Sequence, residues 1–296
     1  MKTRIILNAI PFSIICLMLI SSIFTMGCTN KEKDSCCDKK EEFAKLIEMN
    51  NLAKAESWLI QELEIDSIGE CTTLVSMLLY ELIESNPETM NYSFEKLRGN
   101  GFLNIEVSND GNLRIYMWND ETGLYNGGHQ HIVQYKTNGE IVCIDFMEAY
   151  CPECFESDDY DEFRGFELYT MYLNNQTYYM VEVGHLQAAG WLGCRDISIY
   201  TIEKGKLVKQ AMFKTSREIL SEIGFEYDAA SYYYDFIQEN DDSIDWLFKY
   251  DDKHRIIYVP LVGISESDFI VTDKYLLYQW NGELFKYIGV ERGKRK

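Results

Sequence analysis

Residues 132–142 read IVQYKTNGEIV, and this stretch decides the class of fold. β-branched and aromatic residues lie on both sides of Asn138-Gly139, a dipeptide typical of two-residue β-hairpin turns. The same arrangement recurs where residues 197–200, ISIY, precede Lys204-Gly205, and where residues 276–279, LLYQ, precede Asn281-Gly282. The sequence therefore predicts antiparallel strands joined by tight turns.

Turns of this kind divide the whole chain after residue 102. They are Asn109-Asp110-Gly111, Asn138-Gly139, Asn174-Asn175, Lys204-Gly205, Asp251-Asp252 and Asn281-Gly282. Short and long gaps alternate between them, so the hairpins group into three four-stranded meanders over residues 103–146, 166–213 and 244–290. This grouping predicts an internal repeat.

Several of the expected strands are apolar on both faces, as residues 256–259, IIYV, illustrate. Such strands suit sheets that are stacked between other sheets. Three units are fewer than the four or more blades of a closed propeller. We therefore expect a mainly β fold in which three tandem four-stranded antiparallel meander units form a propeller-like open arc behind an N-terminal helical segment.

The helical segment is expected over residues 41–101. Apolar residues there recur at three- and four-residue steps, as in Trp58, Leu59 and Leu63. Asn86-Pro87 stops the second helix and can start a short third one, and Gly99 and Gly101 end the helical region. Residues 102–296 then form the β domain.

The amino-terminal stretch carries a targeting pattern. Lys2 and Arg4 precede an apolar run that reaches Phe24, and residues 25–28, TMGC, follow it. This pattern resembles a bacterial lipoprotein signal. The resemblance implies removal of a signal peptide over residues 1–27, attachment of a diacylglycerol and an amide-linked acyl chain such as palmitate to Cys28, and a polar tether over residues 28–40.

The resemblance also implies a location and a first partner. A lipidated Cys28 would attach the protein to a membrane of the cell envelope, which we expect to be the outer membrane, on its periplasmic or surface face. An uncleaved anchor and ordinary secretion are the alternatives. Residues 110–116, 225–228 and 272–278 are also similar to a broad group of exported Bacteroidota proteins without an established activity. That similarity implies location and fold and supplies no mechanism.

Composition excludes one class of partner. The chain has 28 basic and 48 acidic residues, a net charge of −20, and therefore lacks the clustered Lys and Arg that nucleic acids require. A hydrophobic content of 46% indicates a folded protein. Without Cys16 and Cys28 an odd number of cysteines remains, so at least one thiol stays unpaired within the chain; the pairing of the others is left open.

The meander topology predicts where binding residues lie. The short turns lie at one end of each sheet, so the longer connections at 119–128, 184–193 and 263–268 collect at the other, together with the links 147–165 and 214–243. Long loops on a rigid scaffold are common binding sites. We call this end the loop rim, and its candidate ligand-binding residues are Asp120, Glu121, His129, His131, His185 and Trp191.

Other chemistries are less favoured by the sequence. His129 and His131 are spaced so that both side chains point to one face of a strand, and together with His185 they could bind a metal ion. No acidic residue has a spacing that identifies it as a further ligand. The CPEC motif at 151–154 lacks a second cysteine pair, and the acidic run at 156–162 lacks an EF-hand pattern. We therefore expect no metal and no cofactor.

Two classes of function remain. The favoured one is a membrane-anchored envelope lipoprotein that binds a glycan, peptide or protein partner through the loop rim. The alternative is an exported hydrolase that uses carboxylates or histidines of the rim, although no motif defines a nucleophile or an acid–base pair.

Overall fold

The computed structural model describes residues 30–65, 70–119, 129–146, 150, 162–186, 192–228, 248–265 and 268–292. The chain divides into two compact units, Met1–Lys45 and Leu46–Lys296. The signal peptide and Cys28 lie outside the described residues, so lipidation stays a prediction. Mainly β structure is confirmed, with 53% of the described residues in strands and 27% helical.

A helix starts earlier than expected. Helix α2 spans Asn30–Glu48 and therefore covers most of residues 28–40, which were expected as a polar tether. The stretch contains neither Pro nor Gly and is rich in Lys and Glu, which are good helix formers, so no residue in it interrupts a helix. Its use as a tether remains a prediction.

The other helices follow the expected order. They are α3 (Leu52–Ile65), α4 (Glu70–Ser85), the 3₁₀ helix η1 (Pro87–Asn91) and α5 (Glu95–Gly99). Asn86 separates α4 from η1 because its side-chain oxygen accepts a hydrogen bond from the backbone N–H of Glu88 at 3.0 Å. The predicted stop at Asn86-Pro87 is confirmed.

The strands form three sheets. The first sheet has the order β1-β2-β3-β4, the second contains β5, β6, β7, β8 and β11, and the third has the order β10-β9-β15-β14-β13-β12. The strand bounds are β1 Leu103–Val107, β2 Leu113–Asn119, β3 His129–Thr137, β4 Glu140–Asp145, β5 Glu162–Leu173, β6 Gln176–Leu186, β7 Leu192–Glu203, β8 Lys206–Gln210, β9 Phe213–Lys214, β10 Ile219–Leu220, β11 Glu222–Asp228, β12 Lys249–Asp251, β13 Ile256–Ser265, β14 Asp268–Trp280 and β15 Phe285–Arg292.

All of the predicted turns connect neighbouring antiparallel strands. Asn138 and Gly139 have φ values of 50° and 83°, and Asn174 and Asn175 have values of 50° and 62°. Two successive positive φ values are what a type I′ hairpin turn requires, and Asn and Gly adopt them at the least cost. The hairpin turns predicted at Asn138-Gly139 and Asn174-Asn175 are therefore confirmed.

The repeat of three equal units is not confirmed, since the sheets contain four, five and six strands. The link 214–243 was expected to be loop, but it contains β10 and β11. Strand β11 pairs with β7 in the second sheet, whereas β9 pairs in parallel with β15 in the third. Strands β9 and β10 have only two residues each and pair with each other, whereas β9 joins the third sheet through β15, which lies far away in the sequence and is not indicated by a local pattern.

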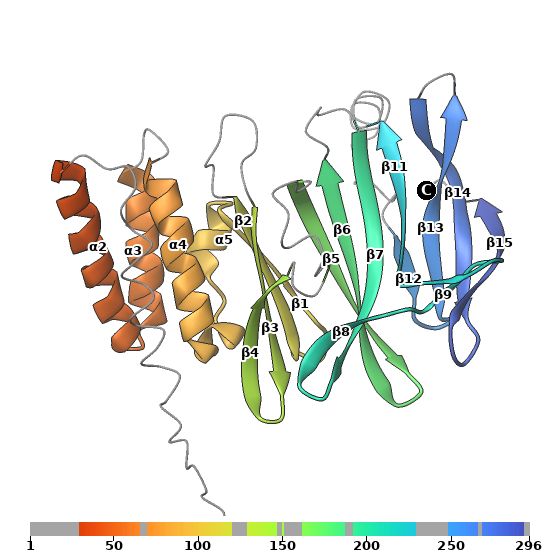
Figure 1. The fold of residues 1–296 in the computed structure, drawn as a ribbon, viewed down its shortest axis with the longest axis horizontal. Coiled ribbons are helices and arrows are strands. Elements are labelled where there is room, and N and C mark those ends of the chain that lie inside the picture. The colour runs from red at the N-terminus through yellow and green to blue at the C-terminus, as the bar shows by residue number, and fades with distance from the viewer. Residues whose placement is uncertain are drawn as a thin grey trace, which may run out of the picture. The chain divides into compact units, whose positions relative to one another are not determined.

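The second sheet is buried on both faces. One core cluster joins it to the first sheet through residues such as Val133 and Val181, and another joins it to the third sheet through residues such as Met180 and Ile257. Within the unit Leu46–Lys296, Figure 1 shows the helices α3 to α5, then the three sheets in succession. The expectation of sheets stacked between other sheets therefore holds for the second sheet. Residues 256–259, on which the expectation was based, lie in the third sheet and alternate between buried and half-buried.

Polar side chains attach the helices to the first sheet. The guanidinium of Arg114 donates hydrogen bonds to the carbonyl oxygens of Thr89 (3.1 Å), Met90 (2.9 Å) and Tyr92 (2.5 Å). Trp118 donates from its indole nitrogen to the hydroxyl of Ser76 in α4 at 2.8 Å. These bonds satisfy buried carbonyl groups at the ends of η1, so they fix the helices on the sheet.

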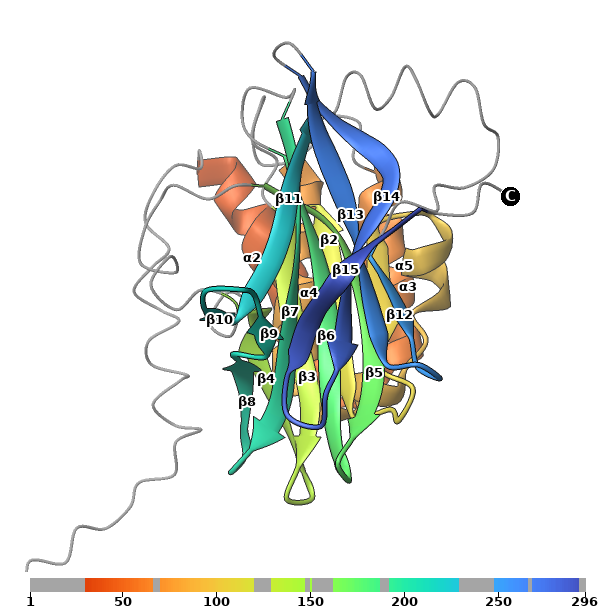
Figure 2. The ribbon, with the colours of Figure 1, turned by 90° about the vertical axis from the view of Figure 1, so that its right-hand side faces the viewer.

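The third sheet curls into a half-barrel. Its ladders shift register between Pro260 and Val262 and between Leu277 and Tyr278, and such bulges increase local bending and twist. Figure 2 views this sheet, with β15 in front and β9 beside its lower end. Strands β13 and β14 continue to Ser265 and Asp268, so the connection 263–268, expected as a long loop, is a short hairpin.

Candidate functional site

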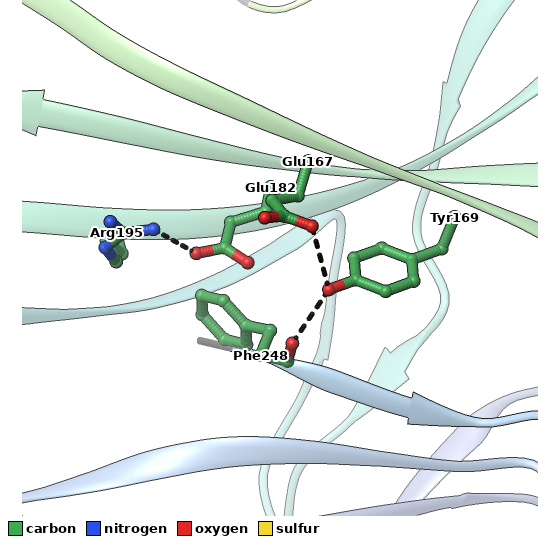
Figure 3. A network of polar contacts seen from close by, with 5 residues as sticks. All are labelled: Glu167, Tyr169, Glu182, Arg195 and Phe248. Carbon is green, nitrogen blue, oxygen red and sulfur yellow. Dashed lines mark hydrogen bonds and ion pairs between the residues drawn. The ribbon is translucent and has the colours of Figure 1, made fainter. Parts of the chain in front are cut away.

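A polar network lies between the second and third sheets, at a position that was not predicted from the sequence. Its centre is an ion pair in which Nη1 of Arg195 lies 2.5 Å from Oε1 of Glu182. The Glu182 side chain is 1% exposed, whereas that of Arg195 is 29% exposed. Figure 3 shows Glu182 between Arg195 on one side and Glu167 and Tyr169 on the other.

The strand register places the two charges together. Glu182 in β6 is paired with Ile197 in β7, so Arg195 is its diagonal neighbour, two residues along β7. Val181 and Val183 belong to the core against the first sheet. Because side chains alternate along a strand, Glu182 faces the third sheet instead. This face also carries the apolar side chains of Met180, Ile197 and Ile199, which pack against the third sheet.

Strand β5 extends the network towards the third sheet. Glu167 is paired directly with Glu182, and the hydroxyl of Tyr169 lies 3.4 Å from Oε2 of Glu167. The same hydroxyl donates a hydrogen bond to the backbone oxygen of Phe248 at 3.1 Å. Phe248 directly precedes β12, so Tyr169 connects the second sheet to the third (Figure 3).

Burial makes Glu182 a proton-binding group near neutral pH. Removal from water raises the pKa of its carboxyl group to about 7; Arg195 opposes this rise, and the nearby charge of Glu167 adds to it. Among the described residues, Oε2 of Glu182 has no hydrogen-bond partner. Burial, followed by the charge of Glu167, also raises the pKa of Glu106 in β1. Glu182 and Glu106 therefore retain protons more strongly than exposed carboxyl groups do.

A second perturbed carboxyl group lies on the opposite face of the second sheet. Burial and the charge of Glu222 raise the pKa of Asp196 to about 6, while Lys209 opposes the rise. Lys209 also donates to Oε2 of Glu222 at 2.5 Å. Asp196 occupies space left free by Gly224, because a Cβ atom there would lie 1.7 Å from its Oδ1. The glycine is needed for close approach across β7 and β11.

The chemistry available to the network is limited by these positions. Arg195 is exposed enough to meet an anionic group, and Glu182 can hold or release a proton behind it. Glu182 and Asp196 lie on opposite faces, since Asp196 pairs with Val183 and Glu182 with Ile197. They therefore cannot act on one bond as an acid–base pair. Within the described part of the chain, no group of three or more potential ligands could hold a metal ion.

The structure places few of the candidates that were predicted on the loop rim. Asp120, Glu121 and Trp191, like Cys28, lie outside the described residues, as do the CPEC motif and nearly all of the acidic run. The backbones of His129 and His185 lie in β3 and β6, but their side chains are outside the described set.

His131 lies within the described residues and differs from the expectation of an exposed rim residue. It is 5% exposed and shares a strand face with Val133 and Tyr135, which pack against the second sheet. It is paired with Met117, so the inward face of β3 begins earlier than the polar sequence HQH suggests. A buried histidine of this kind belongs to the core between the two sheets.

One sequence signal could have identified Glu182, although not its partner. Glu182 interrupts residues 180–183, MVEV, in a strand that is apolar on both sides, and a charge in such a position needs a partner.

The structure adds one detail to the prediction about cysteines. Cys143 carries a free thiol whose pKa burial raises to about 12, so this thiol is unreactive at neutral pH.

The fold is that of a layered β protein in which helices cover the first of three mainly antiparallel sheets. No family model, curated protein or solved structure matches this chain. Among the described residues there is no helix with the length and hydrophobicity needed to span a membrane.

Proposed function

We propose that this chain is a lipoprotein of the bacterial cell envelope, anchored through Cys28 to the outer membrane. Support comes from the residues themselves: a basic start, an apolar run to Phe24 and a small residue before Cys28. Two or three acyl chains on Cys28 provide stable attachment, whereas one chain gives only marginal binding. The membrane is then a partner through the lipid alone.

The proposed activity is binding of a glycan, peptide or protein at the loop rim. The observation that carries it is topological: β2, β6 and β13 all end on the side opposite the turns at 138–139, 174–175 and 281–282 (Figure 1). The second sheet, buried on both faces, makes this scaffold rigid. Asp120, Glu121, His129, His185 and Trp191 supply polar and aromatic contacts, and the buried His131 supports them from within β3.

A propeller-like open arc is the finer form of this proposal. Each sheet contains an up-and-down meander, namely β1 to β4, β5 to β8 and β12 to β15, which supports an arc of three units with added strands. A hydrolase that uses carboxylates or histidines of the rim remains the second candidate. The raised pKa values of Glu182 and Asp196 mark two proton-binding groups away from the rim, and their placement on opposite faces of one sheet prevents them from acting as an acid–base pair.

The anchor is tested by mass spectrometry of the mature amino terminus and by fractionation of cells that express Cys28→Ser. We expect an acylated Cys28 in the wild type and loss of membrane attachment in the variant. An unmodified cysteine or an intact Met1 contradicts the anchor.

The rim is tested separately by binding of the purified protein to envelope glycans and to chemically crosslinked envelope proteins. A variant that combines Trp191→Ala and Glu121→Gln should lose at least tenfold in affinity. Asn174→Asp and Glu140→Gln, at the opposite turns, are the matched controls and should bind as the wild type does. Equal loss in rim and control variants contradicts a binding role for the rim.

A further inference from the structure

The outer edge of β15 is largely unpaired. Of the residues in β15, only Phe285 and Lys286 pair with β9, and among the described residues the segment 287–292 pairs with β14 alone. An unpaired strand edge presents N–H and C=O groups that can accept a further strand. This edge lies on the third sheet and does not involve the loop rim.

The hydrogen bonds show which groups point outward. The N–H of Phe285 donates to the carbonyl oxygen of Met212 at 2.8 Å, and that of Trp280 donates to Arg255 at 2.9 Å, so the paired residues Trp280 and Phe285 do not bond to each other. Hydrogen-bonded and non-hydrogen-bonded pairs alternate along an antiparallel ladder. Because the backbone groups of Phe285 point away from β14, those of Tyr287, two residues further along, point outward as well.

One extra residue then shifts the alternation. Tyr287 is paired with Tyr278, and the next pair joins Gly289 with Leu277, so Ile288 is an extra residue that forms a bulge in β15. Gly289 has a φ of 144°, a value that favours glycine. Beyond the bulge, the N–H and C=O groups of Val290 point outward. They form a template for strand addition.

The side chains of this edge are unusually apolar for a surface. Tyr287, Ile288 and Val290 are 39%, 50% and 49% exposed, and they lie within four consecutive residues. Isolated exposed apolar residues are ordinary, whereas a group of them beside an open strand edge marks an interaction surface.

Charge identifies the kind of occupant. Residues 285–296 contain one acidic residue, Glu291, and five basic ones, whereas the whole chain has a net charge of −20. The basic residues are Lys286, Arg292, Lys294, Arg295 and Lys296. Arg292 already forms an ion pair with Asp273 of β14, with 2.8 Å between Nε and Oδ2, so Lys286 is the unengaged cation within the described strand. A second copy of the chain would bring the same positive segment against this one, and like charges weaken cross-strand pairing. An acidic segment of another protein meets opposite charge instead.

We propose that the outer edge of β15 docks an extended acidic segment of a partner protein, which adds as a strand to the third sheet. The backbone of Tyr287 and Val290 supplies hydrogen bonds, the exposed apolar side chains contact alternate residues of the segment, and Lys286 selects for acidic residues. The site is separate from the rim, so either can fail without the other.

The probe for this site is a fluorescent synthetic peptide of alternating Glu and Val residues, and binding is measured by anisotropy on the full folded chain. A peptide of alternating Lys and Val tests the charge preference. The acidic peptide with N-methyl groups on alternate amides tests strand addition, because methylation removes backbone donors. We expect binding of the first peptide only, weakened as salt rises from about 0.05 to about 0.5 M.

Two proline variants form a matched pair. Val290→Pro removes an outward N–H without breaking the ladder to β14. Val107→Pro does the same on the edge strand β1, where Val107 is 47% exposed and lies next to the bonded pair of Ser108 and Leu113. We expect V290P to lose at least tenfold in affinity and V107P to bind as the wild type does. Lys286→Glu should weaken the acidic peptide and improve binding of the basic one.

Several outcomes overturn the proposal. They are no binding of the acidic peptide to the wild type, equal binding of the N-methylated peptide, equal binding of the basic peptide, and unchanged affinity of a folded V290P. Self-association of the wild type that V290P abolishes, seen by sedimentation, assigns the edge to a second copy and overturns it as well. If V290P does not fold, the N-methylated peptide still decides.

Discussion

Glu182 and Arg195 form an ion pair in which the carboxylate is buried and the guanidinium is partly exposed, with 2.5 Å between Oε1 and Nη1. The asymmetry matters because the buried carboxylate bears the larger loss of hydration, while the cation keeps part of its water. The pair lies between two sheets, so its charge state contributes to their attachment.

The first prediction concerns pH. The pKa of Glu182 is raised to about 7 from its ordinary value of 4.5, so the folded protein binds a proton more strongly than the unfolded chain does. This contribution to stability is fully present below about pH 4.5 and is lost as pH rises through about 7. Urea unfolding should show a decline on the order of 3 kcal/mol from this group over that window.

Glu182→Gln provides the control for that decline. Asp196, whose pKa is raised to about 6, contributes a decline of the same sign at lower pH. The comparison is therefore sharpest between about pH 6 and about pH 8, where E182Q should be flatter than the wild type. Parallel curves for the two proteins above pH 6 contradict the assignment.

The second prediction concerns Arg195. Arg195→Met leaves Glu182 buried without its cation, so the free energy of unfolding at neutral pH should fall by about 2–4 kcal/mol. Adding Glu182→Gln to this variant should recover part of the loss, because the buried charge is then absent. Lys209→Met breaks a more exposed pair with Glu222 and should cost about 0–1 kcal/mol. Equal costs for the two single variants would argue against a special role for burial.

The third prediction concerns Arg114. Its guanidinium serves three backbone oxygens, those of Thr89, Met90 and Tyr92, in a planar fork. Arg114→Lys retains the charge but cannot reach all three, so unfolding in urea should show a loss of about 2–4 kcal/mol. Lys136→Arg, on β3 and half-buried, is the control and should change stability by less than about 0.5 kcal/mol.

The fourth prediction compares two glycines. Gly224→Ala places a Cβ atom 1.7 Å from Oδ1 of Asp196 and 2.7 Å from the backbone oxygen of Arg195, so thermal unfolding should occur at a lower temperature. Truncating Asp196 to Ala in the same chain should relieve only the side-chain part of this clash. Gly99→Ala meets nothing within 4 Å at the end of α5 and should be neutral or slightly stabilising.

Local chemistry explains which parts of the fold could be predicted. Asn138-Gly139 and Asn174-Asn175 specify their turns by themselves, because few residues tolerate successive positive φ values. Strands β9 and β11 could not be found in this way, since Phe213 and Tyr227 pair with strands far away in the sequence. Propensity carries no information about such partners.

The candidate site shows the same limit. His131 looked like an exposed polar residue in a short HQH sequence, and only the register with Met117 shows that it faces inward. Glu182 was detectable as a charge in an apolar strand, but its partner was not, because Arg195 becomes a neighbour only when β6 and β7 pair. Sequence patterns identify an unusual residue more readily than the contact that explains it.

Both faces of the second sheet are covered, one by the first sheet and the other by the third. Premature termination or proteolysis after residue 213 would remove β10 to β15 and leave Met180, Ile197 and Ile199 in water. Such a fragment would be an aggregation-prone, strand-rich intermediate with a large exposed apolar surface. Synthesis of the last third of the chain is thus the step that makes the first two-thirds safe from aggregation.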